Sequence, residues 1–354
     1  MTGVYVHIPF CHTRCGYCDF HSQAVGTRTE LFGEYVEQLL ARISRAGEAA
    51  DAPVDTIFFG GGTPTLLAPA LLGAILDGIR AAFDVTADAE ITTEANPESV
   101  EPQTLVGLRR AGFNRISFGM QSADEQVLRA LDRRHTPNRV PQVVQWAREA
   151  GFHNLSVDLI YGTPGETDAS WRHTLEAAIA LAPEHISAYA LTIEPGTPMY
   201  VRMRRGELPD TDPDAQADRY LLADELLTAA GYANYEISNW AKPGFECRHN
   251  LNYWLSGNWY GFGISAHSHF DGVRAWETGE GISEERLTAE QRRTERVLLE
   301  TRLATGLPLE VLTYTERARL PGLVERGLAV VTDRLVLTAR GRLLSDAIIR
   351  DLLD

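Results

Sequence analysis

Short apolar runs alternate with amphipathic segments from the N-terminus to about residue 195. The apolar runs are rich in β-branched and aromatic residues and end at glycine, proline or acidic residues, which predicts β-strands. These strands are expected at residues 4–8, 56–59, 90–97, 115–119, 155–160 and 186–191. Between them, apolar residues recur at helical spacing, which predicts helices at residues 30–45, 71–83, 102–111, 139–150 and 169–180. This alternation predicts an α/β fold with a parallel sheet, either an open barrel or a doubly wound sheet.

The pattern changes twice after the last of these strands. Residues 195–213 are rich in glycine and proline and predict a loop, and a helix is expected over 214–231. From about residue 288 the chain predicts two helices, a hairpin that turns at Asp333-Arg334, and a last helix over Ala339–Leu352. Helices with a two-stranded wing are typical of a winged-helix-like module. We therefore expect a barrel at 1–195, a barrel extension at 196–287 and a winged-helix-like module at 288–354.

The composition is that of a globular chain with an excess of acidic residues. Of the 354 residues, 44% are apolar and 23% are charged, and the net charge is −15. This charge disfavours binding to nucleic acid or to an anionic membrane, and no basic recognition helix stands out in the C-terminal module. We therefore expect that module to pack against the barrel. The longest apolar-rich run, residues 66–76, contains a proline and is too short to span a bilayer.

Three of the four cysteines follow the first predicted strand as C-x3-C-x2-C: Cys11, Cys15 and Cys18. Three thiolates suit an iron–sulfur cubane that is held at three corners and leaves the fourth iron open to a non-protein ligand. A structural zinc site usually takes four protein ligands from paired cysteine knuckles, and the remaining cysteine is the distant Cys247. A zinc site completed by a nearby histidine is the alternative, with three candidates: His7, His12 and His21. Free thiols without a visible export signal predict a reducing compartment, the cytoplasm.

The N-terminal segment resembles the radical S-adenosylmethionine superfamily in three features: the cysteine spacing, Tyr17 before the last cysteine, and the motif Tyr5-Val6-His7-Ile8-Pro9-Phe10. Within it they are similar to the subgroup of the oxygen-independent coproporphyrinogen III oxidases and their relatives. The resemblance covers roughly residues 4–290 and implies a partial (βα)6 barrel. It also implies a [4Fe–4S] cluster on the three clustered cysteines and S-adenosylmethionine as a second cofactor.

Residues at the predicted strand ends are candidates for contacting that cofactor. Gly60-Gly61-Gly62 would let the backbone approach a ligand, although an ordinary tight turn gives the same pattern. Glu94 and Asp158 could hold a ribose diol or an ammonium group; a solvated loop carboxylate or a helix cap is the alternative for each. By resemblance, the positions that contact S-adenosylmethionine are Tyr5, Tyr17, Gly61, Gly62, Thr63, Glu94, Gln121, Arg133 and Asp158. Arg134 takes the place of Arg133 if the alignment shifts by one residue.

A second motif, His249-Asn250-Leu251-Asn252-Tyr253-Trp254, resembles the haem-binding segment of haem chaperones in the same subgroup. An imidazole can ligate haem iron, and the faces of tyrosine and tryptophan can pack on a porphyrin. Taken alone, a histidine among aromatic residues is more often a hydrogen-bonded structural residue. His267 and His269 are weaker candidates that glycine-rich strand packing also explains, and Cys247 reads more simply as a buried apolar residue than as a haem ligand.

Two departures separate the chain from the oxidases. The oxidases carry a further cysteine two residues after the third, where this chain has Asp19-Phe20, and an N-terminal extension, where this chain has four residues before Tyr5. The resemblance therefore implies a cytoplasmic haem chaperone that hands haem to acceptor proteins, including ones at a membrane surface, and that forms a homodimer. The alternatives are an oxidase that removes two propionate carboxyl groups from coproporphyrinogen III, and a zinc-stabilised binding module.

Overall fold

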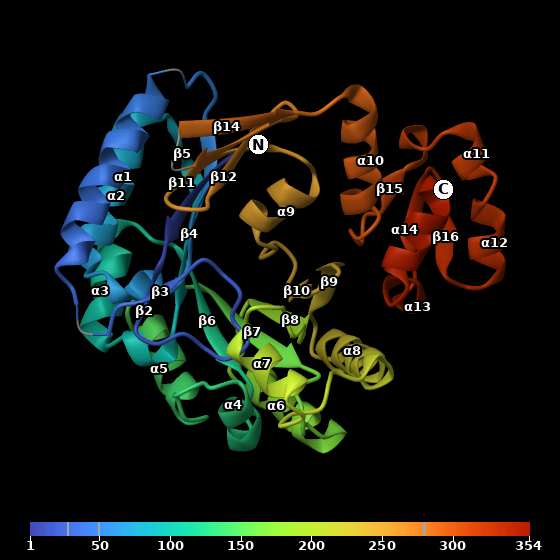
Figure 1. Ribbon diagram of the computed structural model, residues 1–354, viewed down its shortest axis with the longest axis horizontal. Coiled ribbons are helices and arrows are strands. Elements are labelled where there is room, and N and C mark those ends of the chain that lie inside the picture. Colours follow the sequence, from blue (N-terminus) through green and yellow to red (C-terminus); the bar gives the residue numbers. More distant parts are fainter. Residues whose placement is uncertain (27, 49, 279–280) are drawn as a thin grey trace.

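The computed structural model describes residues 1–26, 28–48, 50–278 and 281–354, and within these ranges one sheet has twelve strands. Their order across the sheet is β14-β13-β12-β11-β1-β4-β5-β6-β7-β8-β10-β9 (Figure 1). The strands from β1 to β8 in this order are parallel. They are β1 (Thr2–Ile8), β4 (Val54–Gly61), β5 (Val85–Ala95), β6 (Arg115–Gln121), β7 (Asn154–Tyr161) and β8 (His185–Ala190). Each of the predicted strands is therefore confirmed.

The predicted helices follow these strands and pack on the outer face of the sheet (Figure 1). They are α1 (Leu31–Gly47), α2 (Pro69–Ala82), α3 (Pro102–Ala111), α5 (Arg139–Glu149) and α6 (Asp168–Ala180), and the predicted α8 spans Pro213–Ala229. Their apolar faces are fully buried, as at Leu39, Ile43 and Ile75. Two short helices that the pattern missed, α4 (Glu125–Ala130) and α7 (Pro198–Arg204), lie in connecting segments.

The barrel is open, because β1 and β8 pair with other strands and not with each other. β11 (Asn258–Phe262) adds in parallel to β1, and β12 (His267–Phe270), β13 (Val273–Thr278) and β14 (Gly281–Arg286) continue the sheet in antiparallel order. On the other edge, β10 (Asn239–Ala241) is antiparallel to β8, and β9 (Ala233–Glu236) is antiparallel to β10. Between β10 and β11 lies the helix α9 (Arg248–Trp254). A barrel extension was predicted over 196–287, but its strands were not, because each has only three to six residues.

Residues 288–354, all of which the structure describes, form a separate apolar core. The module contains α10 (Ala289–Glu300), β15 (Leu307–Pro308), α11 (Tyr314–Arg317), α12 (Leu320–Glu325), β16 (Ala329–Val331), β17 (Arg334–Leu337), α13 (Ala339–Arg342) and α14 (Ser345–Leu353). The hairpin is confirmed, but its turn is Thr332-Asp333, since Arg334 already pairs with Pro308. The third strand, β15, was not predicted.

The prediction of one continuous helix over Ala339–Leu352 was wrong. The segment breaks at Leu343–Leu344, where α13 ends and α14 begins. Gly341 lies directly on the carbonyl oxygen of Leu328, with no space for a side chain between them, so α13 is held against the start of the hairpin. The change of direction at the break then lets the buried face of α14, with Ile349, enter the core.

The module lies beside α8 and β9 at one side of the molecule (Figure 1). Arg342 forms an ion pair with Asp224 of α8 at 2.7 Å and a hydrogen bond with Asn234 of β9. Leu303 forms an isolated bridge with Glu236. We propose that the division into 1–195, 196–287 and 288–354 describes the domains, since β14 ends at Arg286 and a separate core begins in α10. No helix among the described residues is long and apolar enough to cross a membrane.

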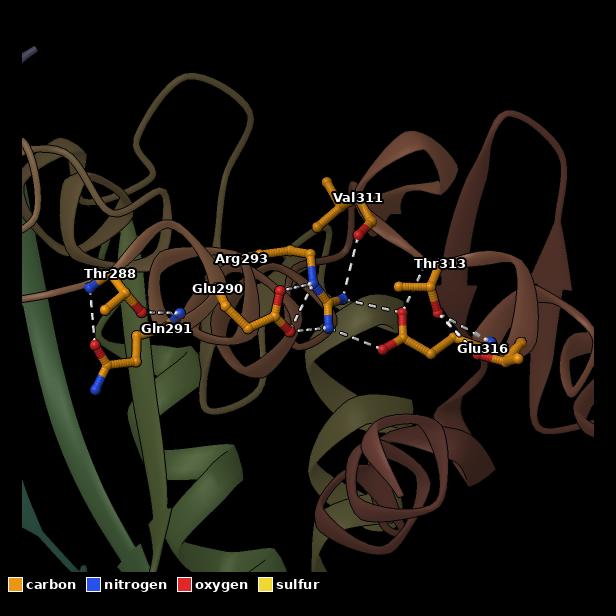
Figure 2. Close-up of polar contacts among 8 residues, drawn as sticks. Thr288, Glu290, Gln291, Arg293, Val311, Thr313 and Glu316 are labelled. Carbon is orange, nitrogen blue, oxygen red and sulfur yellow. Dashed lines mark hydrogen bonds and ion pairs between the residues drawn. The ribbon is translucent and has the colours of Figure 1, made fainter.

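Arg293 links two helix starts within this module (Figure 2). Its guanidinium donates to both carboxylate oxygens of Glu316 at 3.0 Å and also to Glu290. Glu316 in turn accepts the backbone N–H of Thr313 at 2.7 Å, which completes the capping box of α11. The Glu316 side chain is only 8% exposed and has lost most of its hydration. The hydrogen bonds from these donors compensate for that loss.

We expect Arg293→Met to lower the free energy of unfolding by about 2–3 kcal/mol, because it leaves a buried carboxylate short of its charged partner. Arg302→Met is the matched control. Arg302 is as buried as Arg293, at 21% against 22% exposed, but its partner Asp346 is 80% exposed. The control should cost less than about 1 kcal/mol. Urea-induced unfolding of both variants measures the difference, and equal losses would contradict the role of Glu316.

Candidate functional site

A cavity of about 480 Å³ lies on the inner face of the parallel strands. One end is formed by the carboxyl ends of the strands and the cysteine loop, and the other by α9 near the strand beginnings. The predicted site residues in its wall are Tyr5, Cys11, Cys15, Tyr17, Cys18, Gly61, Gly62, Thr63, Glu94, Gln121, Arg133, Asp158, His249, Asn250 and Tyr253. Gly60 and Trp254 lie outside the wall.

The cysteine loop folds back on itself directly after β1. Cys11 ends the short strand β2 (Phe10–Cys11), which pairs in parallel with β3 (Gln23–Ala24). Both ends of the loop are held by backbone bonds, because Gln23 N–H donates to Pro9 O at 2.7 Å and Val25 N–H donates to Cys11 O at 2.9 Å. The three thiols therefore face one cavity from a loop whose ends are fixed.

Two of the three histidines that could complete a zinc site have hydrogen-bond partners of their own. Among the described residues, no group of three or more histidine, cysteine, aspartate or glutamate side chains, the three thiols included, is already arranged to hold a metal ion. Both ring nitrogens of His7 already have partners, the Tyr5 hydroxyl at 3.0 Å and the carbonyl of His21 at 2.8 Å. His12 Nδ1 lies 3.0 Å from the carbonyl of Gly26. Burial raises the pKa of the Cys11 and Cys18 thiols, and metal binding would offset this by holding the thiolates.

Arg133 joins the thiols to the rest of the cavity. Its Nη1 lies 3.7 Å from Cys15 Sγ, and its Nη2 donates to the Gly119 carbonyl at 2.8 Å. Its Nε–H is buried without a partner among the described residues. A guanidinium with an unmatched donor suits a carboxylate ligand. The neighbouring Arg134 is exposed, so Arg133 is the arginine that reaches the cavity.

The glycine run packs its backbone against the cysteine loop. Gly61 has φ +109°, and a Cβ atom there would lie 2.5 Å from the His7 ring. A Cβ atom on Gly62 would lie 2.6 Å from the carbonyl oxygen of Phe10. The N–H of Gly62 donates to Ile8 O at 2.8 Å, and Thr63 N–H donates to Phe10 O at 2.7 Å. A larger residue in this run would displace the loop that carries the thiols.

Two carboxyl groups, Glu94 and Asp158, lie inside the barrel and are neither solvated loop residues nor helix caps. Burial, with repulsion from Asp158, raises the pKa of Glu94 to about 8, although Gly61 N–H donates to its carboxylate at 3.2 Å. Burial also raises the pKa of Asp158, which accepts the Ser117 hydroxyl at 2.9 and 3.0 Å. Two carboxyl groups that are costly to ionise in one cavity suit a cationic ligand.

The remaining cofactor candidates surround these groups. Gln121 ends β6 with φ +63°, a left-handed conformation that turns the chain at the cavity wall. The Thr63 hydroxyl donates to Cys11 Sγ at 3.7 Å. The ring of Tyr5 stacks on Phe58 at a centroid distance of 6.3 Å. Tyr17 packs on an apolar cluster that includes Leu131.

The motif at residues 249–254 lies in the helix α9, whose N-terminus is held by Glu90 of β5. The Glu90 carboxylate accepts the backbone N–H groups of Arg248 and His249 at 3.1 and 3.0 Å and the Cys247 thiol at 3.5 Å. Asn250 Nδ2 lies 3.5 Å from both the Tyr235 hydroxyl and Glu236. The indole N–H of Trp254 is buried without a partner among the described residues.

His249 is 2% exposed, and both of its ring nitrogens have partners. Nδ1 lies 2.8 Å from Thr56 Oγ1, and Nε2 lies 2.8 Å from the Tyr253 hydroxyl. The ring also stacks on Phe58 at 5.3 Å. Burial, helped by the nearby Arg115, lowers the pKa of His249 to about 3, so the ring is neutral over the usual pH range.

The weaker histidine candidates have different surroundings. His269 is buried in β12, where Nδ1 lies 2.8 Å from the Gly257 carbonyl and Nε2 accepts the Gly272 N–H at 3.2 Å. His267 is exposed and packs beside the Trp276 ring. Neither contributes to the cavity wall, whereas Cys247 does.

The sequence pattern missed several polar residues that form the interior of the barrel: Thr56, Glu90, Arg115, Ser117, His185 and Tyr235. One signal for them is present in β5. Glu90, Thr92 and Glu94 alternate with apolar or small residues, so they share one face of the strand, and that face is buried. Acidic residues on the buried face of a strand indicate a polar interior.

Comparison with known proteins agrees with this geometry. Residues 5–178 match the model of the radical SAM superfamily. "Heme chaperone HemW" of Mycobacterium tuberculosis strain H37Rv is 45% identical, with 99% of this chain and 94% of that protein aligned. "Heme chaperone HemW" of Escherichia coli K12 is 43% identical over 75% of this chain and 69% of that protein.

Among solved structures, coproporphyrinogen III oxidase (HemN) from Escherichia coli, a radical SAM enzyme, superimposes with a TM-score of 0.85. It is 26% identical in sequence, and the match covers 99% of this chain and 89% of that one. The partial-barrel α/β fold with a C-terminal module is therefore confirmed. With relatives this similar over nearly its full length, the chain belongs to the HemW family of the radical SAM superfamily.

Proposed function

We propose that this chain is a haem chaperone that carries a [4Fe–4S] cluster and S-adenosylmethionine, binds haem and passes it to acceptor proteins. One observation carries the proposal: a single cavity brings the three clustered thiols and the helix α9 together in a chain of the HemW family. The cofactors follow from membership of the radical SAM superfamily.

Cys11, Cys15 and Cys18 are the proposed cluster ligands. When bound, the cluster and S-adenosylmethionine supply one-electron cleavage of a carbon–sulfur bond. The side chains of this chain bind and orient that second cofactor. Arg133 offers its unmatched N–H to the carboxylate, and Glu94 with Asp158 offers negative charge to the cationic groups. The other proposed contacts are Tyr5, Tyr17, Gly60, Gly61, Gly62, Thr63 and Gln121.

Haem is the proposed cargo, with His249 as its iron ligand and Asn250, Tyr253 and Trp254 as the side chains around it. The acceptor proteins, including ones at a membrane surface, are proposed from the names of the relatives. A cytoplasmic location and a homodimer are further parts of the proposal. The zinc-stabilised module is disfavoured because His7 and His12, two of its candidate fourth ligands, have hydrogen-bond partners elsewhere.

A second candidate function is that of the oxidase, because the solved structure with the same fold across nearly the whole chain is a coproporphyrinogen III oxidase. Its reaction would use the same cofactors and the same cavity. At position 20, where the oxidases carry a further cysteine, this chain has Phe20, and this difference disfavours the oxidase.

Incubation of the anaerobically reconstituted protein with haem and, separately, with coproporphyrinogen III tests the two functions. We expect haem to bind stoichiometrically, with a shifted porphyrin absorption band, and to move to an apo-haemoprotein on mixing. We expect no protoporphyrinogen from coproporphyrinogen III under reducing conditions with S-adenosylmethionine. Turnover of coproporphyrinogen III would refute the chaperone in favour of the oxidase.

Replacement of single cysteines by serine tests the cluster ligands. We expect Cys11→Ser, Cys15→Ser and Cys18→Ser each to lose most of the iron and acid-labile sulfide, because a cubane held at three corners tolerates poorly the loss of one. Cys247→Ser is the matched control, since Cys247 is buried at the other end of the cavity against Glu90. Iron and sulfide analysis after reconstitution gives the answer. Loss of iron in the control alone would overturn the assignment.

The affinity for S-adenosylmethionine should depend on pH through Glu94. With a pKa of about 8, its carboxyl group is protonated at neutral pH, and a bound cation favours the ionised form. Binding then releases a proton, so affinity should rise by up to about tenfold per pH unit below 8 and level off above it. Isothermal titration between pH 6 and 9 measures the slope.

Glu94→Gln should flatten this profile, because the amide does not ionise. Glu166→Gln is the control: burial raises the pKa of Glu166 to about 7, yet this residue lies outside the cavity wall beside Arg219. An unchanged slope in Glu94→Gln would remove Glu94 from the cofactor site.

A further inference from the structure

The two edges of the His249 ring have different surroundings. The edge with Nδ1 and Cε1 faces the wall formed by β1 and β4. A Cβ atom placed on Gly3 would lie only 3.0 Å from Cε1 and 3.1 Å from Nδ1, and Thr56 Oγ1 lies 2.8 Å from Nδ1. An approaching metal would have to displace two strands of the sheet to reach this edge.

The opposite edge faces one side chain, that of Tyr253. Nε2 lies 2.8 Å from the hydroxyl of Tyr253, which is one turn further along the same short helix. His249 and Tyr253 both line the cavity. The Tyr253 ring also packs edge-on against Trp259 of β11 at a centroid distance of 4.7 Å. Rotation of this one side chain away from that contact would expose Nε2.

We propose that Nε2 of His249 is the atom that takes the haem iron, that Thr56 positions the ring through Nδ1, and that the Tyr253 hydroxyl occupies Nε2 until haem displaces it. The proposal rests on the haem-binding function proposed above and adds the ligating atom, a positioning residue and a competing group. Thr56 acts through His249 and does not touch the cargo.

The tautomer of His249 follows from its two hydroxyl partners. A neutral imidazole has one N–H and one acceptor nitrogen. The phenol of Tyr253 is more acidic than the aliphatic hydroxyl of Thr56 and is the better donor. Tyr253 therefore donates to Nε2, and Nδ1–H donates to Thr56. Metal-bound histidines commonly donate their second N–H to such a fixed acceptor, which orients the ring and sets the tautomer.

The backbone of α9 holds this arrangement in place. The Glu90 carboxylate accepts the N–H of His249 itself at 3.0 Å, and the Phe58 ring stacks on the imidazole at an interplanar angle of 23°. His249 is therefore fixed on three sides, by Glu90, Thr56 and Phe58. Tyr253 is the partner that belongs to the same helix as His249.

Haem titration of the full-length reconstituted protein tests the proposal. Thr56→Val removes the acceptor at Nδ1 and should weaken haem binding about tenfold or more, with a changed low-spin signal in electron paramagnetic resonance. Thr56→Ser keeps the hydroxyl and should restore both properties. Tyr253→Phe removes the competing hydroxyl and should raise the association rate about threefold to tenfold, as expected for the loss of one hydrogen bond.

Thr92→Val is the matched control for removing a buried hydroxyl from the sheet. Thr92 lies on β5, is fully buried like Thr56, and its hydroxyl has no partner among the described residues. Thr92 is also outside the cavity wall. The control should leave haem affinity and the spectrum unchanged. Thermal melting of each variant identifies a loss of folding, and the Tyr253→Phe rate remains a test if Thr56→Val does not fold.

The outcomes separate this inference from the function on which it rests. If the unaltered chain binds haem and Thr56→Val has the same affinity and spectrum, Thr56 does not position the ligand and the inference is wrong, while the chaperone function stands. A slower association in Tyr253→Phe would likewise show that Tyr253 assists haem binding and does not compete with it. If the unaltered chain binds no haem, the proposed function itself fails.

Discussion

The inward face of the parallel strands is polar, and the pairing of these buried groups is the constraint on which the rest of the structure depends. Around α9 many of the groups are matched: Glu90 accepts three donors, and His185 lies 2.8 Å from both Ser156 and Tyr235. The Arg115 Nε–H and the Trp254 indole N–H are exceptions, because they have no partner among the described residues. At the thiol end the matching is incomplete. Arg133 keeps a buried N–H without a partner among the described residues, and Glu94 is costly to ionise. A ligand with both an anionic and a cationic group would complete that end.

This difference separates two uses of polar residues within one barrel. At the α9 end, Glu90 builds structure, because a carboxylate that accepts helix N–H groups stabilises the helix start and loses little by burial. At the thiol end, the unmatched Arg133 N–H and the buried Glu94 carboxyl group suit a charged ligand. Burial alone does not identify this cofactor site, since both ends of the cavity are buried.

Much of the barrel could be predicted from the sequence, because each strand is a short apolar run that alternates with an amphipathic helix. The cysteine loop could also be predicted, since three thiols at this spacing have few other uses. The extension strands β9 to β14 could not, because they gain stability from pairing with β1 and β8 and carry little apolar signal of their own. The break in the last helix at Leu344 could not be predicted for a similar reason, since the contact between Gly341 and Leu328 is set by tertiary packing.

For the candidate site, the motifs indicated which residues to expect, but not which of them reach the cavity or what their hydrogen-bond partners are. Arg133 and not Arg134 reaches the cavity because the chain turns through Asp132, which has φ +55°. His249 was expected among aromatic residues, yet no sequence pattern could show that Thr56, 193 residues away, lies at its Nδ1. Such partners come from strands that neighbour each other only in the folded sheet.

The connection from β10 to β11 has a mechanical consequence. β10 belongs to one edge of the open barrel and β11 to the other, so residues 242–257, with α9 in their middle, tie the two edges together across the base. A tie of fixed length limits how far the curved sheet can spread. Through Glu90, which accepts two backbone N–H groups of α9, this tie is also anchored to β5 in the interior of the sheet.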